Sequence, residues 1–337
     1  MKRLVIHCDG NHDSGFGHFS RCLAILNILN FFDSGIVTIF IGNYSEHALR
    51  RLKVEGVNFF QVEEGQSFTE KIFEAISHQP TDFLLVDSYL APQSFYNKLT
   101  QDKIRWGVID DFCTQDFSSA NLVINFRVRA EQLFQYHARN CALGTDFTPI
   151  QLKFLPIRKK NERKALNLNI ESILICLGGN DIYKVSAKLL QTVASVFRNA
   201  TINLLLSDNH IINKLQEKYK ADIRIEIGSL RSDIENLMID TDLIISGGGM
   251  LKYEASYCGI PNATLSQTED QYQDTLILEE LGVTLNLGLA NNYQVDKVQS
   301  KLLSFSLEDR QRMHDNQLKH FHRDTHSKIV NILLAQF

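Results

Sequence analysis

The amino-acid sequence predicts an α/β protein with two Rossmann-like domains, each built around a parallel sheet. Three observations support this prediction. The chain has 337 residues, and single hydrophobic cores seldom grow beyond about 250–300 residues, so two domains are expected. Short runs of Val, Ile and Leu alternate with segments whose apolar residues recur at helical spacing. The apolar runs are nearly continuous, which is typical of strands buried on both faces of a parallel sheet.

The first half of the chain contains six candidate strands. Their ranges are Leu4–Cys8, Val37–Ile41, Asn58–Val62, Phe83–Val86, Trp106–Ile109 and Leu122–Ile124. Between them, Phe19–Phe32 and Thr69–Ser77 carry apolar residues at helical spacing. Strands that alternate with helices indicate βαβ units, so residues 1–150 are predicted to form the first domain.

Residues 151–168 are predicted to link the two domains. The segment PIQLKFLPIRKKNERKALNLN around them holds two of the five prolines and the run Arg158-Lys159-Lys160. Proline and charged residues favour an exposed connection, so the run is interpreted as a solvated basic segment. An exposed loop within one domain is the alternative.

Six further candidate strands follow in the second half. Their ranges are Ser172–Leu177, Asn203–Leu206, Arg224–Ile227, Leu243–Ser246, Asn262–Leu265 and Thr284–Leu287. A second Rossmann-like domain is therefore predicted over residues 169–315, with a ligand cleft between the two domains. The last stretch, Leu307–Phe337, has a helical pattern, and its histidines are interpreted as part of a solvated helix face.

Composition and charge argue against several classes of protein. A formal net charge of −4 disfavours a nucleic-acid scaffold that works by bulk electrostatics. No segment approaches the roughly 20 apolar residues that cross a bilayer, and the apolar run near the N-terminus breaks too early for a signal peptide. The six cysteines form no CxxC or CxxH pair, so no metal site is predicted. We expect a reduced, cytoplasmic protein without stable membrane insertion, and its oligomeric state is left open.

The stretch DGNHDSGFGHFSRCLAI follows the first strand and carries the first candidate site. Gly15 and Gly17 lie where this strand passes into a helix, so free N–H groups and the positive end of a helix dipole face the loop. The loop is therefore a candidate anion site. The third glycine of a dinucleotide fingerprint is replaced by Ser20, which disfavours NAD binding.

A titratable ring and a cation follow this loop. His18 could accept a proton at neutral pH, because an imidazole ordinarily titrates near pH 6.5. Arg21 could add positive charge for an anionic ligand, and a cation on the helix surface is an equally good interpretation. The simpler alternative for the whole stretch is a tight turn whose polar residues cap a helix.

Two glycine turns follow strands of the second half, LGGND and SGGGMLKYEASYCGIP. Consecutive glycines let ligand phosphates approach the backbone closely. A carboxylate about one turn into the next helix suits a sugar hydroxyl, whereas a turn with a helix-stabilising acidic residue is the alternative. The predicted nucleotide contacts are Gly178, Gly179, Asn180, Gly247, Gly248, Gly249, Tyr253 and Glu254.

Polar residues also end two strands of the first half. One strand ends in VDSYL, with Asp87 and Tyr89, and another ends in VIDDF, with Asp110 and Asp111. In an open α/β sheet the ligand crevice lies outside the carboxyl ends of the strands. We therefore predict substrate contacts at Asp87 and Asp110, although each residue taken alone is more often a helix cap.

Five segments taken in order resemble the motifs of nucleotide-sugar hydrolases of pseudaminic acid biosynthesis and of the related spore-coat polysaccharide proteins. They are GFGHFSRCLAI, VDSYL, VIDDF, LGGND and GGGMLKYEASYCGIP. The resemblance extends to about Gln271 and implies a GT-B fold like that of MurG-type glycosyltransferases. It also implies that a C-terminal helix over residues 316–337 returns toward the first domain. The implied reaction is hydrolysis of UDP-2,4-diacetamido-2,4,6-trideoxy-β-L-altropyranose with release of UDP, in pseudaminic acid or surface polysaccharide biosynthesis.

The resemblance also implies roles for individual residues. His18 matches the catalytic histidine, Tyr89 matches a tyrosine that contacts substrate, and Glu254 matches the acidic residue expected on the nucleotide ribose. The chain departs from the pattern at Met250–Tyr253, where the family often has small hydroxyl or amide residues. The expected partner is a UDP-sugar, with no cofactor, metal or nucleic acid. A GT-B glycosyltransferase and a non-catalytic nucleotide-sugar-binding protein are the alternatives.

Overall fold

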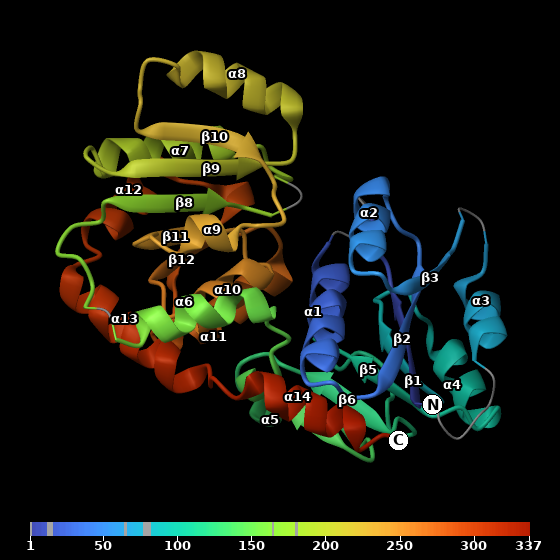
Figure 1. Cartoon of the computed structure of the whole chain (residues 1–337). Helices are drawn as coiled ribbons and strands as arrows, with labels where there is room; N and C mark the ends of the chain where they lie inside the picture. Colours follow the sequence, from blue (N-terminus) through green and yellow to red (C-terminus); the bar gives the residue numbers. More distant parts are fainter. Residues whose placement is uncertain (1, 12–15, 64–65, 77–81, 164, 179–180) are drawn as a thin grey trace. The chain divides into compact units, whose positions relative to one another are not determined.

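The computed structural model describes residues 2–11, 16–63, 66–76, 82–163, 165–178 and 181–337. The chain divides into two compact units. The first unit is Met1–Leu152 together with Asp324–Phe337, and the second is Lys153–Arg323. Each is a parallel sheet with packed helices, as predicted (Figure 1). The cleft expected between the two units stays a prediction.

The first unit contains a seven-stranded parallel sheet of order β3-β2-β1-β4-β5-β6-β7. The strands are β1 (Lys2–Cys8), β2 (Ile36–Gly42), β3 (Asn58–Gln61), β4 (Asp82–Asp87), β5 (Trp106–Ile109), β6 (Leu122–Asn125) and β7 (Cys141–Leu143). Strands are added on one side of β1 up to β3 and then on its other side from β4 onward. This reversal makes β1 and β4 the topological switch point, where open α/β sheets bind ligands. Cys8 pairs with Asp87 at the carboxyl ends of these two strands.

The second unit contains a six-stranded parallel sheet of order β10-β9-β8-β11-β12-β13. The strands are β8 (Ser172–Cys176), β9 (Thr201–Leu206), β10 (Ile225–Ser229), β11 (Leu243–Ser246), β12 (Asn262–Ser266) and β13 (Leu285–Leu289). Its switch point lies between β8 and β11, where Cys176 pairs with Ser246. The two glycine turns of this half therefore leave neighbouring strands at the same edge.

Helices cover both sheets (Figure 1). In the first unit they are α1 (Gly17–Phe31), α2 (Glu46–Val54), α3 (Phe68–Ala75), α4 (Gln93–Gln101), α5 (Ala130–Leu133) and α14 (Thr325–Leu334). In the second unit they are α6 (Leu155–Asn161), α7 (Ser186–Val196), α8 (Asn209–Tyr219), α9 (Glu235–Met238), α10 (Met250–Tyr257), α11 (Glu269–Glu280), α12 (Val295–Leu303) and α13 (Leu307–His320). Short 3₁₀ turns lie at Thr145–Phe147, Leu152–Phe154 and Ala290–Asn292.

Helix α1 is apolar on most of its surface because it is covered on two sides. It contacts β1 and β2 of the sheet and also α14. A helix that is hydrophobic nearly all round is buried rather than amphipathic. Its N-terminus, which carries His18, is thereby fixed next to the switch point of the first sheet.

Residues 151–168 differ from the predicted linker. Most of the first half of this segment is helical, as α6, and Arg158 is buried, so the prediction of a solvated basic run is wrong at this residue. Its guanidinium donates to the carbonyl oxygens of Tyr257 at 2.7 Å, Phe321 at 2.8 Å and Leu318 at 3.1 Å. Five N–H donors make arginine able to satisfy several buried carbonyl groups at once.

The C-terminal segment also differs from its prediction. Helix α13 belongs to the second unit, and the chain enters the first unit at Asp324 rather than at residue 316. His314 and His326 are buried, so the solvated helix face is wrong for both. Each ring forms a hydrogen bond with one backbone carbonyl group. His314 Nδ1 lies 2.6 Å from the oxygen of Gly259, and His326 Nε2 lies 3.0 Å from that of Ile150.

Candidate functional site

His18 and Asp87 form a hydrogen-bonded pair at the switch point of the first sheet. His18 lies in the first turn of α1, Asp87 ends β4, and Nδ1 of the imidazole is 2.6 Å from Oδ1 of the carboxylate. Burial opposes ionisation of Asp87, but the charges of Arg21 and His18 outweigh it and hold the pKa of this carboxyl well below its usual range. An ionised carboxylate only accepts hydrogen bonds, so His18 donates from Nδ1 and keeps its lone pair on Nε2.

Arg21 binds two buried carboxylates, that of Asp87 in this pair and that of Asp111. Its Nε and Nη2 donate to Asp87 at 2.6 and 2.5 Å, and its Nη1 donates to Oδ2 of Asp111 at 2.8 Å. The guanidinium also lies over the ring of Phe126. Burial lowers the pKa of Arg21, but Asp111 and Asp87 raise it well above its usual range. Arg21 is therefore a buried structural cation rather than a cation on the helix surface.

Tyr89 completes the cluster and is its most exposed member. Its hydroxyl donates to Oδ2 of Asp111, and its ring meets that of His18 edge to face with centroids 4.4 Å apart. Burial of the hydroxyl group and the neighbouring Asp111 carboxylate raise the pKa of Tyr89, so it remains a neutral phenol. Tyr89 is 54% exposed, which leaves its ring accessible to a ligand.

Asp110 points to a different set of partners. Its Oδ2 accepts the backbone N–H of Cys113 at 2.6 Å and the hydroxyl proton of Tyr136. This carboxylate stabilises the turn after β5, and burial raises its pKa. The geometry brings Asp111, and not Asp110, to the cluster around His18. Only its place at the end of a predicted strand could have indicated Asp111 from the sequence.

The glycines at the switch point of the second sheet divide into two kinds. Gly247 and Gly248 are required by packing: a Cβ on Gly247 would lie 1.9 Å from the carbonyl oxygen of Leu177, and Gly248 has a φ of +89°. Gly178 and Gly249 are exposed, and a Cβ on either would meet no atom within 4 Å. Packing and backbone conformation therefore account for Gly247 and Gly248. Gly178 and Gly249 border open space, although the φ of +103° at Gly178 also favours a glycine there.

Three of the predicted contacts, Gly15, Gly179 and Asn180, lie outside the described residues. Gly17 begins α1 and is exposed. A Cβ at Gly17 would meet nothing within 4 Å, so neither packing nor backbone conformation requires a glycine at this position.

Glu254 is a buried carboxylate on α10. It is 8% exposed, and among the described residues its side chain has no recorded hydrogen bond or ion pair. Burial raises its pKa to about 7, although the charge of Lys153 opposes this shift. Buried polar groups are normally hydrogen-bonded, so an unpaired carboxylate beside the glycine turns is suited to hydroxyl donors from a ligand.

Tyr253 and Lys252 precede Glu254 and have partners within the protein. The Tyr253 hydroxyl donates to Asp274 at 2.8 Å, and Nζ of Lys252 lies 2.6 Å from Oδ2 of the same residue. All three side chains are buried. This group joins α10 to α11, so the structure places Tyr253 in a structural contact rather than at an open surface. No local pattern in the sequence indicates the Lys252–Asp274 pair.

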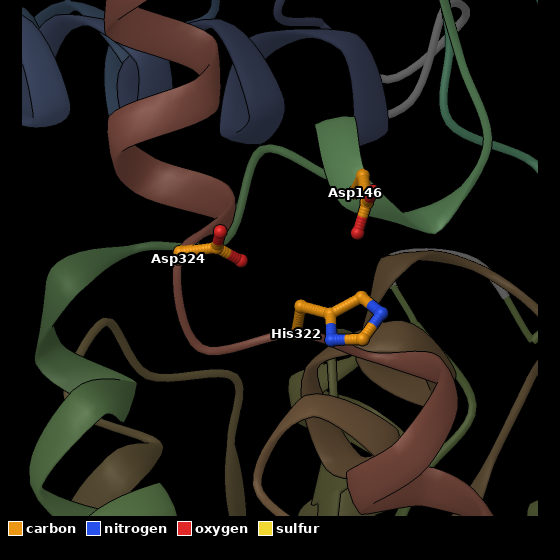
Figure 2. A group of neighbouring side chains, drawn as sticks. All are labelled: Asp146, His322 and Asp324. Carbon is orange, nitrogen blue, oxygen red and sulfur yellow. The ribbon is translucent and has the colours of Figure 1, made fainter.

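Two carboxylates of the first unit, Asp146 and Asp324, lie near each other (Figure 2). Both form ion pairs with Lys328, with distances of 2.8 and 3.5 Å. The lysine compensates their charge, so we assign no metal to them. His322, also drawn in Figure 2, belongs to the second unit.

Among the helices in the described part of the chain, none is both long and apolar enough to cross a bilayer.

No family model matches the chain. Three curated proteins are distant relatives. An uncharacterised protein of Methanocaldococcus jannaschii is 25% identical over 286 residues, which cover 81% of this chain and 58% of that protein. The spore coat polysaccharide biosynthesis protein SpsG of Bacillus subtilis is 24% identical, covering 84% of this chain and 83% of SpsG.

The third relative is a Helicobacter pylori protein named pseudaminic acid cytidylyltransferase and UDP-2,4-diacetamido-2,4,6-trideoxy-beta-L-altropyranose hydrolase. It is 21% identical, and the match covers 88% of this chain and 52% of that protein. The chain thus spans little more than half the length of two of these relatives.

Solved structures agree with the topology. MurG of Acinetobacter baumannii superposes with a TM-score of 0.68 at 14% identity and full coverage of both chains. The chain has a GT-B-like fold. A UDP-glucose:anthocyanidin 3-O-glucosyltransferase in complex with UDP gives a TM-score of 0.65 at 12% identity, covering 99% of this chain and 98% of that chain. At these identities the likeness concerns the fold alone.

Proposed function

We propose that the chain is a hydrolase that cleaves a UDP-activated diacetamido-trideoxy sugar to UDP and the free sugar, with His18 as general base. The His18–Asp87 pair carries this proposal, because it fixes the tautomer that leaves Nε2 able to accept a proton. Two of the distant relatives are named for the hydrolysis of such a UDP-sugar and for spore-coat polysaccharide biosynthesis. Such a role belongs to the biosynthesis of pseudaminic acid or of a related surface polysaccharide.

In the proposed step a water oxygen attacks the anomeric carbon of the sugar. The bond from this carbon to the phosphate oxygen breaks, and UDP leaves with the bonding electron pair. Nε2 of His18 takes a proton from the attacking water, and Asp87 accepts the Nδ1–H of the imidazolium that forms. Because two carboxylates face one guanidinium in this cluster, an excess of negative charge compensates the new positive charge.

We propose that the second unit binds the nucleotide. Gly178 and Gly249 border open space, and Gly249 precedes the N-terminus of α10, which favours a phosphate group. The carboxylate of Glu254, which has no hydrogen-bond partner among the described residues, would accept hydrogen bonds from ribose hydroxyls. This assignment supports a UDP-linked substrate but does not depend on which sugar it carries.

A glycosyltransferase is the second candidate, favoured by the glucosyltransferase–UDP complex of the same fold. The same base could then take a proton from an acceptor hydroxyl instead of from water. A non-catalytic nucleotide-sugar-binding protein is a third candidate. It would leave the His18–Asp87 pair without a chemical role.

The test is to incubate the full chain with UDP-2,4-diacetamido-2,4,6-trideoxy-β-L-altropyranose in ¹⁸O-labelled water. We expect free UDP, detected by NMR, and a sugar with ¹⁸O at the anomeric position, detected by mass spectrometry. The variant His18→Asn should form neither product. His210→Asn, an exposed histidine on α8, is the matched control. Turnover only after an acceptor is added indicates the transferase, and UDP binding without turnover indicates the binding protein.

A further inference from the structure

The carboxylate of Asp111 accepts hydrogen bonds from two neighbouring side chains. Nη1 of Arg21 donates to Oδ2 at 2.8 Å and lies 3.2 Å from Oδ1, and the Tyr89 hydroxyl donates to Oδ2. Asp111 is 6% exposed and already meets these two donors, whereas Tyr89 is more than half exposed. Of the two side chains that hold Asp111, Tyr89 is therefore the one placed to meet a ligand.

We propose that Asp111 is a positioning residue that fixes the direction of the Tyr89 hydrogen bond, so that Tyr89 meets the substrate only as an acceptor. A phenol has one proton, and here it is donated to Asp111. The lone pairs of the phenolic oxygen remain, and they need a donor. This inference rests on the proposed function, and it specifies the group that Tyr89 selects: an N–H or O–H of the sugar, such as an acetamido N–H, or the attacking water.

Arg21 makes this direction obligatory. A guanidinium only donates hydrogen bonds, so it holds the Asp111 carboxylate as an acceptor. A carboxylate in turn has no proton to give to Tyr89. The raised pKa of Tyr89 agrees with a phenol that keeps its proton. The direction of the bond therefore follows from the chemistry of three side chains.

In the neighbouring pair, Asp110 and Tyr136, a tyrosine hydroxyl donates to a carboxylate and also accepts a hydrogen bond from an amide. The Tyr136 hydroxyl donates to Oδ2 of Asp110, and its oxygen accepts the Nδ2–H of Asn125 at 2.9 Å. An amide N–H thus occupies, at Tyr136, the place that we assign to a substrate donor at Tyr89. Tyr136 is also the matched control, since Tyr136→Phe removes an equivalent hydroxyl that does not contact the His18 cluster.

The variant Asp111→Ala tests the proposal most directly. It removes the carboxylate that accepts the phenolic proton, so the direction of the Tyr89 hydrogen bond is no longer fixed. We expect kcat for UDP release to fall about 10–100-fold with Asp111→Ala or with Tyr89→Phe. We expect the double variant to be no slower than the slower single variant, because both remove one shared interaction. Tyr136→Phe should keep kcat within about twofold.

A spectroscopic measurement separates this inference from the proposed function. In protein labelled at tyrosine ¹³Cζ, the resonance of Tyr89 is identified by its loss in Tyr89→Phe. We expect this resonance to shift in Asp111→Ala and not in Tyr136→Phe. The same measurement is made on the wild type, which carries no substitution that could disturb folding. We expect its Tyr89 resonance not to titrate near pH 10, where a free tyrosine ionises.

The outcomes are distinguishable. An unchanged Tyr89 resonance in folded Asp111→Ala, an ordinary titration of Tyr89 in the wild type, or multiplicative losses in the double variant would each overturn the inference. Absence of UDP release by the wild type from every sugar tested would overturn the proposed function. The NMR measurements would then still decide whether Asp111 holds the phenolic proton.

Discussion

Oδ1 of Asp87 lies 2.6 Å from Nδ1 of His18, although the two residues are 69 positions apart in the chain. The contact exists because β1, which leads into α1, pairs directly with β4, which ends in Asp87. The proposed general base therefore depends on the switch point of the sheet, and a substitution at either residue should affect turnover in its own way.

Replacing His18 by Asn tests the base itself. We expect kcat to fall about 10²–10⁴-fold, because proton transfer by a positioned side chain typically contributes that much. Melting temperature and UDP affinity should change little. A capping role for His18 predicts the opposite result, a lower melting temperature with normal turnover per folded molecule, and measuring all three quantities on one preparation separates the two.

Replacing Asp87 by Asn should be worse for both stability and turnover. The amide can no longer balance the buried Arg21, and breaking a buried ion pair typically costs about 3–5 kcal/mol. The His18 tautomer is also no longer fixed, which in a comparable triad costs about 10⁴-fold in kcat. Urea denaturation and kcat measure the two effects. Asp102→Asn, which removes an exposed ion pair with Lys98, is the control and should leave both nearly unchanged.

Glu254 should make the stability of the second unit depend on pH. Burial raises its pKa from 4.5 to about 7, so the unfolded chain binds fewer protons than the folded one between these values. Stability contributed by this group is therefore present below pH 4.5 and lost as the pH rises through about 7. Glu254→Gln should remove this pH dependence of the melting temperature, and an unchanged profile would contradict the assigned burial.

The affinity for UDP should respond to pH in the opposite direction. Hydroxyl donors of a ribose stabilise the ionised carboxylate, so affinity should rise as Glu254 loses its proton near pH 7 and level off above it. Calorimetry between pH 5.5 and 8.5, roughly one and a half units to either side, measures this change. The assignment of Glu254 to the nucleotide fails if wild type and Glu254→Gln bind UDP equally at all pH values.

The glycines should separate packing from binding. Gly249 has a φ of −81° and open space around its Cβ position, so Gly249→Val should fold normally and weaken UDP binding. Gly248 has a φ of +89°, so Gly248→Ala should lower the melting temperature by itself. Calorimetry and thermal melts on both variants test this contrast. If Gly249→Val binds UDP as tightly as the wild type, the contrast is refuted.

Apolar runs predicted all but one of the strands in the described part of the chain, because buried parallel strands such as β1 and β4 need nearly unbroken apolar runs. The missed strand, β7, has only three residues and lies at the sheet edge. Strand ends also pointed correctly to the neighbourhood of His18 and Asp87. The partners of charged residues could not be predicted, since Arg21 meets Asp111 across 90 positions and Arg158 binds carbonyls up to 163 positions away. Local patterns carry no information about such long-range pairing.

The return of the last helix has a consequence for the order in which the chain folds. The first unit lacks α14 until synthesis passes residue 324, 172 residues after its first segment ends at Leu152. At about 5–20 residues per second the ribosome needs roughly 10–30 s for this stretch. During that time the apolar surface of α1 that α14 later covers is open, while the second unit is already emerging as one continuous segment. Synthesis of the first unit thus begins before that of the second unit and ends after it.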